Sequence, residues 1–288
     1  MNVVVTGASG YVGEAVLSYL TKAGHQVTGI ARHQPKGFPP GVRWALGDAR
    51  DMDLNEVFGG ADAVVHLIGI IKEIPQRGIT FHALHVGITE RVLLSMQTSG
   101  VSRLVHMSAL GTRNGASSQY HRTKWQAEQL IKAHPSIRAT IVRPSLIFGG
   151  TPPFFQMLQN LSKLPRIPVP GDGMTQFQPV ARDDMASLIA QALTDEASVG
   201  LTLELGGPER FTLNQLFDAV AEKSGRHRSP KIHLPLALVG AVAGLNAVLP
   251  MPITPDQLAM LTEPNVTEDT RWHQWVARPR RFSSWNLK

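Results

Sequence analysis

Short apolar runs alternate with longer, helically spaced stretches through the first half of the chain. The short runs are rich in Val, Ile, Leu and Ala, which is typical of parallel strands buried on both faces. The longer stretches repeat apolar residues every three or four positions, as helices that cover a sheet do. This alternation predicts an α/β fold built on a doubly wound parallel sheet. The predicted strands are residues 3–6, 25–31, 42–46, 63–68, 104–108 and 140–144, and the predicted helices are residues 11–23, 80–99 and 118–134.

The pattern loosens beyond Gly149 and Gly150. Residues 151–173 hold five prolines, and proline interrupts regular structure, so we expect a loop-rich stretch without a regular core element. Further on, helices are predicted at residues 183–193 and 212–224, and a strand at residues 201–205. We therefore divide the chain into a sheet domain, residues 1–150, a smaller portion interleaved with the last sheet elements, residues 151–270, and a tail, residues 271–288.

Composition narrows the class of protein. The chain has 288 residues, of which 43% are hydrophobic and 17% charged, and this excludes a disordered chain. It contains no Cys, which excludes disulfides, thiolate nucleophiles and Cys-ligated metal sites. No apolar run reaches the ~20 residues of a membrane span. The N-terminus lacks the basic segment of a secretory signal, so we expect a cytoplasmic protein.

The formal net charge of +6 is concentrated at the C-terminus. Residues 271–288 hold five basic residues and no acidic one, which leaves 23 basic against 22 acidic residues elsewhere. A body so nearly neutral lacks the extended basic face that a nucleic-acid backbone requires. We therefore expect no nucleic-acid partner.

A glycine-rich turn joins the first predicted strand to the first predicted helix. Gly7, Gly10 and Gly13 are spaced three residues apart there. Glycine permits a tight turn, lets backbone N–H groups approach a pyrophosphate and lets the helix pack closely on the strand. The helix N-terminus adds free donors and a positive dipole end. The turn, with Ser9, Tyr11 and Val12 between its glycines, therefore predicts dinucleotide binding.

The end of the second predicted strand indicates which dinucleotide. A carboxylate usually stands there to accept a hydrogen bond from a ribose 2′-hydroxyl, but this chain has Arg32, with Lys36 nearby. An arginine suits a 2′-phosphate, so we expect NADP(H), with NAD(H) as the alternative. Asp48 follows the third strand and is a candidate acceptor for the adenine amino group, or else a helix cap.

Tyr120 and Lys124 are spaced four residues apart on a predicted helix, so they share one face. An adjacent cation favours the phenolate of a tyrosine. We therefore expect Tyr120 to be a general acid/base for a carbonyl or an alcohol, with Lys124 lowering its pKa and contacting the nicotinamide ribose.

These motifs together resemble the extended short-chain dehydrogenase/reductase superfamily. The resemblance rests on residues 6–13, on Tyr120 with Lys124, on Arg143-Pro144 with Phe148-Gly149, and on residues 184–186. Residues 106–111, 206–209 and 252–265 are most similar to the atypical branch, which contains the nucleotide-binding accessory subunit of respiratory complex I and its bacterial relatives. The resemblance implies a Rossmann-type sheet and a C-terminal substrate portion. It also implies cofactor contacts from Leu67, Gly69 and Pro144.

The chain departs from the superfamily pattern at two catalytic positions. Family enzymes carry a catalytic Ser or Thr after the fifth strand, and here the pair reads Ser108-Ala109, with alanine second. Side chains on a strand alternate between faces, so the offset would turn Ser108 away from the substrate unless the strand has already ended. The Asn of the family's proton relay is replaced by residues 85–87, His-Val-Gly. Ser108 stays a candidate catalytic residue beside Tyr120 and Lys124.

Two functions remain open at this stage. The first is an NADP(H)-dependent oxidoreductase for a hydrophobic carbonyl, alcohol or quinone-like substrate, which would bind between the sheet domain and residues 150–260. The second is a nucleotide-binding structural or assembly protein with little turnover. The eleven His residues show no metal-like spacing, so we expect no metal site.

The tail combines its arginines with Trp272, Trp275 and Trp285, and residues 234–250 are apolar apart from Asn246. The simpler interpretation is a helix that lines the substrate pocket, followed by a tail packed on the body. The alternative is an interfacial anchor, which would associate the protein with the inner face of a membrane or with a respiratory complex.

Overall fold

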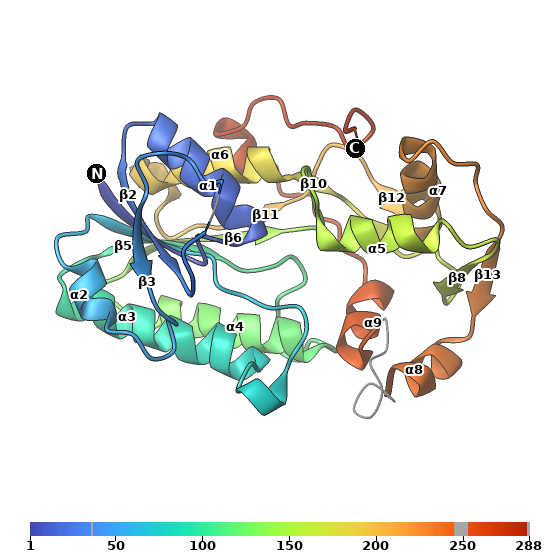
Figure 1. Ribbon diagram of the computed structural model, residues 1–288, viewed down its shortest axis with the longest axis horizontal. Coiled ribbons are helices and arrows are strands. Elements are labelled where there is room, and N and C mark those ends of the chain that lie inside the picture. Colours follow the sequence, from blue (N-terminus) through green and yellow to red (C-terminus); the bar gives the residue numbers. More distant parts are fainter. Residues whose placement is uncertain (36, 245–252, 287–288) are drawn as a thin grey trace.

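One sheet of seven parallel strands forms the centre of the computed structural model, which describes residues 1–35, 37–244 and 253–286 (Figure 1). Its strand order is β3-β2-β1-β4-β5-β6-β11, so the direction of winding reverses between β1 and β4. The predicted Rossmann-type α/β fold is confirmed. The strands are β1 (Asn2–Thr6), β2 (Gln26–Ala31), β3 (Arg43–Leu46), β4 (Ala63–His66), β5 (Arg103–Met107), β6 (Arg138–Pro144) and β11 (Thr202–Leu205).

Helices cover both faces of the sheet, because alternate side chains of each strand point to opposite faces. Val3 and Val5 of β1 pack with the helices on one face, and Val4 packs with those on the other. The first face is covered by α1 (Tyr11–Lys22) and α6 (Arg182–Thr194), and the second by α2 (Leu54–Phe58), α3 (Ile88–Thr98) and α4 (Gln119–Lys132).

The predicted helix at residues 80–99 is divided in two. Its first part is a π-helix, η2 (His82–Gly87), and its second part is α3. A π-helix has a wider turn than an α-helix, and such insertions are frequent at functional sites. The short helix α2 had no counterpart among the predicted elements.

A smaller lobe follows the sheet. It contains α5 (Pro153–Leu161), β8 (Ile167–Pro170), α7 (Leu213–Lys223), β13 (Lys231–Leu234), α8 (Leu236–Gly244) and α9 (Pro255–Thr262), together with the short strands β7 (Ile147–Phe148), β9 (Gln176–Phe177), β10 (Val180–Ala181) and β12 (Phe211–Thr212). The expectation of irregular structure at residues 151–173 is wrong, because α5 places Phe155 and Leu158 in the core of the lobe. Pro152 and Pro153 occupy the N-cap and first turn of α5, where a helix needs no donor from them.

The tail packs on the protein, as the simpler interpretation expected. It begins with a 3-10 turn, η5 (Arg271–Gln274), and runs along α6 before it reaches the lobe (Figure 1). Trp272 and Trp275 are buried in the core beneath α1 and α6, while Phe282 and Trp285 pack with Phe155 of the lobe. Burial on the body contradicts the lipid-anchor alternative for Trp272 and Trp275.

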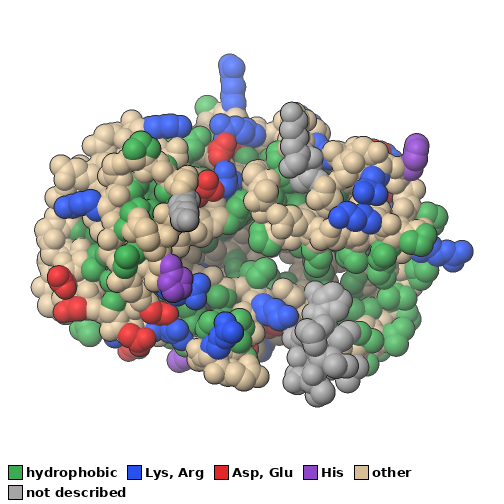
Figure 2. Space-filling model, viewed as in Figure 1, with side chains coloured by type: hydrophobic (Ala, Val, Ile, Leu, Met, Phe, Trp, Pro, Cys, Tyr) green, Lys and Arg blue, Asp and Glu red, His purple; other side chains and the backbone are tan. Residues whose placement is uncertain are grey.

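None of the helices in the described ranges is long and apolar enough to cross a membrane. The helix expected within residues 234–250 is α8 up to Gly244, and its remainder lies outside the described residues. The division of the chain at residue 150 stays a prediction. On the face drawn in Figure 2, the surface is hollowed between the sheet and the lobe.

Candidate functional site

The turn between β1 and α1 has the geometry that its glycines predicted. Gly7 adopts a φ of +69°, which L residues with side chains rarely adopt. A Cβ at Gly13 would lie 2.4 Å from the carbonyl oxygens of both Gly7 and Ala8. The first turn of α1 therefore packs against the preceding glycine turn more closely than a residue with a side chain at position 13 would allow. Its free amides and positive dipole end suit an anionic group.

Tyr11 anchors this turn to the segment that follows β7. Its hydroxyl donates to the carbonyl oxygen of Gly149 at 2.5 Å, and the guanidinium of Arg182 lies over its ring. Burial raises the pKa of Tyr11, so the phenol stays protonated. Tyr11 thus fixes the start of α1 against α6.

A cavity of about 540 Å³, which we call the main cavity, joins this turn to the expected catalytic residues. It opens at the carboxyl ends of the central strands, where ligands bind in doubly wound sheets. Of the residues expected from the sequence, the main cavity is lined by Gly7, Gly10, Tyr11, Val12, Gly13, Leu67, Gly69, Ser108, Tyr120, Lys124 and Pro144.

Tyr120 and Lys124 project from α4 into the main cavity. The Nζ of Lys124 donates to the carbonyl oxygen of Met107 at 2.9 Å, and burial lowers the pKa of Lys124 to about 8. Burial and the charge of Asp256 raise the pKa of Tyr120 to about 12. The net shift of the Tyr120 pKa is therefore opposite to the lowering expected from Lys124, because burial dominates it. At neutral pH the Tyr120 phenol is therefore protonated.

Ser108 lines the main cavity, but its hydroxyl group is bound to another side chain. Its side chain is buried and donates to the carboxylate of Glu128 at 2.6 Å, and Arg143 binds the same carboxylate with two hydrogen bonds. The neighbouring Ala109 lines the main cavity and offers no hydroxyl. This contradicts the catalytic role expected for Ser108, because its hydroxyl is committed to a buried ion pair.

Three residues expected to contact the cofactor lie outside the main cavity: Ser9 of the glycine turn, and Arg32 and Asp48, which were expected at the adenosine end. Arg32 is exposed directly after β2, and Ser9 is exposed in the glycine turn. The carboxylate of Asp48 is bound by both Nε and Nη2 of Arg50, and this hydrogen bonding lowers the pKa of Asp48, with a smaller contribution from the charge of Arg32. Lys36 lies outside the described residues.

Two further residues shape the site although the motifs did not reveal them. His85 of η2 packs edge-on against the ring of Tyr120, and its Nδ1 is bonded to the Thr123 hydroxyl at 2.9 Å. Asp256 of α9 accepts hydrogen bonds from the backbone amides of Gln119 and Tyr120. It therefore ties the lobe to the first turn of α4. Thr254 and Gln257, which form a capping box at the start of α9, were the available sequence signal for a helix beginning here.

His66, His85 and His106 are buried beneath the main cavity on the side of α3 and α4. Burial lowers the pKa of His66 to about 3 and that of His85 to about 2, so both rings are neutral. Within the described ranges, no three His, Asp or Glu side chains come together to hold a metal ion.

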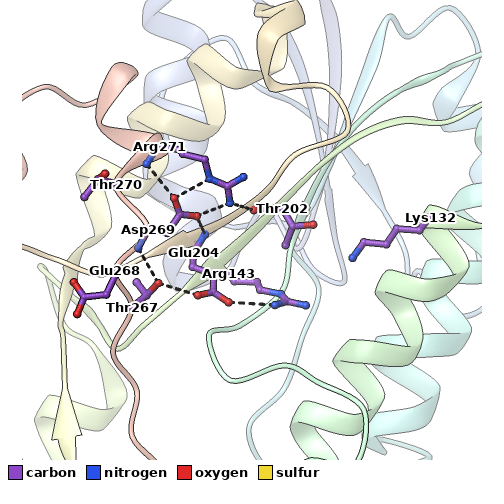
Figure 3. Close-up of a pocket in the computed structure, with 9 residues that line it drawn as sticks. All are labelled: Lys132, Arg143, Thr202, Glu204, Thr267, Glu268, Asp269, Thr270 and Arg271. Carbon is purple, nitrogen blue, oxygen red and sulfur yellow. Dashed lines mark hydrogen bonds and ion pairs between the residues drawn. The ribbon is translucent and has the colours of Figure 1, made fainter.

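A second, charged groove of about 670 Å³ lies beside the outer strand β11 (Figure 3). Most of the charged side chains in it bind one another: Arg143 pairs with Glu204, and Arg271 pairs with Asp269. Thr267 also donates to Glu204. Figure 3 shows these contacts linking the chain before the tail to the edge of the sheet. The groove is therefore a connection between segments, and we do not treat it as the candidate site.

The fold and the main cavity define a protein of the Rossmann-fold class with its site at the carboxyl edge of the sheet. Residues 3–206 match the NAD dependent epimerase/dehydratase family. The chain belongs to this family.

Individual relatives agree with this assignment. The chain is 31% identical to the mitochondrial NADH dehydrogenase [ubiquinone] 1 alpha subcomplex subunit 9 of Arabidopsis thaliana, over 92% of this chain and 69% of that protein. It is 30% identical to an uncharacterized protein of Mycobacterium tuberculosis, over 76% of this chain but only 23% of that much longer protein. A nucleoside-diphosphate-sugar epimerase structure from Staphylococcus aureus superposes with a TM-score of 0.81 over 100% of both chains, at 18% identity, and so shares the fold.

Proposed function

We propose that the protein binds NADP(H) and transfers a hydride to or from a hydrophobic carbonyl or alcohol. One observation carries this proposal: the main cavity joins the glycine turn of α1 to Tyr120 and Lys124. The turn fits a pyrophosphate. A Cβ at Gly7 or Gly13 would crowd the neighbouring backbone, so only glycine allows the tight turn that presents the first amides of α1 to a ligand. The family description, which names NAD, supports a nicotinamide nucleotide.

The chain's own residues supply the proton. A bound nicotinamide nucleotide supplies or accepts the hydride. With a pKa of about 12, Tyr120 is protonated at neutral pH and suited to donate its phenolic proton to a carbonyl oxygen as that oxygen gains negative charge. Lys124, buried beside it, adds a positive charge that favours the resulting phenolate.

Tyr120→Phe tests the proposed role of Tyr120. The variant should abolish NADPH oxidation with an active carbonyl compound and leave nucleotide affinity nearly unchanged. An unchanged rate would refute the role of Tyr120.

The preference for NADP(H) is supported by Arg32, which stands where a carboxylate would accept a 2′-hydroxyl. A charge-assisted contact with a 2′-phosphate contributes about 1.5–3 kcal/mol, which corresponds to roughly ten- to a hundredfold in affinity. We expect NADPH to bind tighter than NADH by that factor in a fluorescence titration, and Arg32→Ala to narrow the difference. Equal affinities in the unmodified protein would contradict the preference.

A second candidate is a nucleotide-binding subunit or assembly factor of a respiratory complex that seldom turns over. Ala109 favours it, because the main cavity lacks a hydroxyl where family enzymes carry their catalytic Ser or Thr. The name of the plant relative supports the same assignment. A screen of carbonyl compounds and quinones without turnover above background would favour this candidate. A gain in rate with Ala109→Ser would instead show that the site works and lacks only one hydrogen-bond donor.

A further inference from the structure

A second cavity of about 340 Å³, which we call the lobe cavity, lies within the C-terminal lobe. Helices α5, α7, α8 and α9 and strands β8 and β13 surround it. Every side chain that lines it is apolar, among them Phe154, Met157, Leu238, Val239, Val242 and Leu261. A wall of this kind offers no partner to a polar group, so it selects a ligand made of hydrocarbon.

The lobe cavity is too large to be an ordinary packing defect. Protein interiors are close-packed, and few of their voids exceed the size of a water molecule. An apolar cavity of about 150 Å³ already stays dry and binds small hydrocarbons. The lobe cavity has more than twice that volume and is open to solvent, so its apolar lining would face water unless a ligand covered it.

The lobe cavity adjoins the main cavity. Phe154, near the start of α5, lines both. On α9, Met260 lines the main cavity while its neighbour Leu261 lines the lobe cavity. A molecule with a polar end beside Tyr120 could therefore extend its apolar part past Phe154 into the lobe.

The lobe cavity also reaches the protein surface. Leu238 and Val242 line it and are nevertheless 54% and 39% exposed. Leu236 and Ile232, beside them in the chain, are 43% and 41% exposed, and Figure 2 shows hydrophobic side chains gathered over this part of the lobe. Helix α8 is apolar on all sides, a pattern expected of a buried helix. An apolar opening of this kind suits entry of a chain from a lipid phase.

We propose that the lobe cavity binds the hydrocarbon chain of an amphiphilic substrate whose polar end reaches Tyr120 in the main cavity. The position of the polar end rests on the function proposed above. Binding of the hydrocarbon chain rests on the lobe cavity alone. The position of the polar end and the binding of the hydrocarbon can therefore be refuted independently. The hydrocarbon is an acyl or an isoprenoid chain, since both share the required chemistry.

A displacement assay with the full-length protein tests the binding of the chain. The protein is loaded with the apolar dye N-phenyl-1-naphthylamine, which is then displaced by straight-chain methyl ketones of six, ten and thirteen carbons. Each buried CH₂ contributes about 0.8 kcal/mol, so we expect affinity to tighten roughly fourfold per added carbon until the cavity is full. Geranylacetone, an isoprenoid ketone that also has thirteen carbons, compares the two chain types. The proposal would be overturned if neither thirteen-carbon ketone displaced the dye, or if all the ketones displaced it with the same affinity.

Two matched variants on α5 locate the binding site. Met157 lines the lobe cavity, whereas the adjacent Gln156 is exposed and does not. Met157→Trp should fill the cavity and weaken 2-tridecanone on the order of tenfold, with a much smaller effect on 2-hexanone. Gln156→Trp should change neither. Val239→Trp fills the cavity from α8 and provides a second test should Met157→Trp fail to fold. Equal affinity in both filled variants and the unmodified protein would refute the location.

NADPH oxidation, followed in the same samples, separates this inference from the proposed function. Chain-length-dependent binding without oxidation of any ketone supports the lobe cavity and contradicts the oxidoreductase. Oxidation that is equally fast for short and long ketones, and is unaffected by Met157→Trp, supports the oxidoreductase and contradicts the lobe cavity as its substrate site.

Discussion

Replacement of Trp272 by alanine tests whether the tail is part of the fold. Trp272 is 0% exposed and packs in the core beneath α1 and α6. Removing a buried Trp side chain costs about 3–5 kcal/mol, and for a protein of this size each kcal/mol lowers the melting temperature by roughly 2–4 °C. We therefore expect Trp272→Ala to melt roughly 6–20 °C below the unmodified protein in calorimetry.

Two controls sharpen this test. The Nε1 of Trp272 has no hydrogen-bond partner within the described part of the chain, so Trp272→Phe removes no hydrogen bond and should cost only about 1–2 kcal/mol. Arg278 is exposed in the same tail, and Arg278→Ala should change stability by less than about 0.5 kcal/mol. An unchanged melting temperature in Trp272→Ala, together with loss of binding to anionic vesicles, would refute the packed tail and restore the anchor.

Three further replacements test individual residues of the site. Ser108→Ala removes a hydrogen bond to the buried carboxylate of Glu128 and should lower the free energy of unfolding by about 1.5–3 kcal/mol in denaturant titrations, while NADPH oxidation stays within about twofold. A loss of rate without a loss of stability would return Ser108 to the catalytic residues. Burial lowers the pKa of Lys124 from 10.5 to about 8, so between these values the unfolded chain binds more protons. Stability should therefore rise with pH from about 8 to 10.5, by on the order of 3 kcal/mol relative to Lys124→Met, and parallel pH curves for the two proteins would contradict the burial of this charge. Gly13→Ala places a Cβ 2.4 Å from the carbonyl oxygen of Gly7, and it should lower the free energy of unfolding by about 1–3 kcal/mol and weaken NADPH binding in fluorescence titrations. An unchanged affinity for NADPH would argue against nucleotide binding at the turn.

The sheet could be predicted because its signals are local. Each central strand is a short apolar run, and burial on both faces removes the need for polar residues within it. Glycines at 24 and 100 follow the first helix and the helix before β5, where both adopt positive φ values that end a helix cheaply. Helix α5 was missed for an equally local reason, because its prolines look like helix breakers until their position at the first turn is known.

The site could be predicted only in part, because some of its determinants come from distant segments. The turn at Gly7 and the spacing of Tyr120 and Lys124 are visible in the sequence. The pKa of Tyr120 is not, since it depends on burial and on Asp256, which lies 136 residues away in the chain. The direction of the Ser108 hydroxyl is likewise set by Glu128 on another element. Residue spacing within one segment therefore cannot predict the pKa of Tyr120 or the partner of the Ser108 hydroxyl.

The charge of the tail suggested an anionic partner outside the protein, but the structure accounts for most of it within the protein. Five basic residues at the end of a nearly neutral chain suggest an anionic partner outside the protein. In the structure, Arg271, Arg280 and Arg281 of the tail form ion pairs with acidic residues of the protein itself. Arg280 binds Asp184 at 3.0 Å, and Arg281 binds Glu209 at 3.2 Å. Each pair is partly exposed and contributes little energy alone. Together these pairs orient the tail, and its buried aromatic side chains stabilise it on the body. The excess of basic residues in the tail therefore reflects its packing against the rest of the protein. Exposed apolar side chains also lie on α8, where Leu236, Leu238 and Val242 reach the surface beside the lobe cavity, and it is there that we expect contact with a hydrophobic ligand.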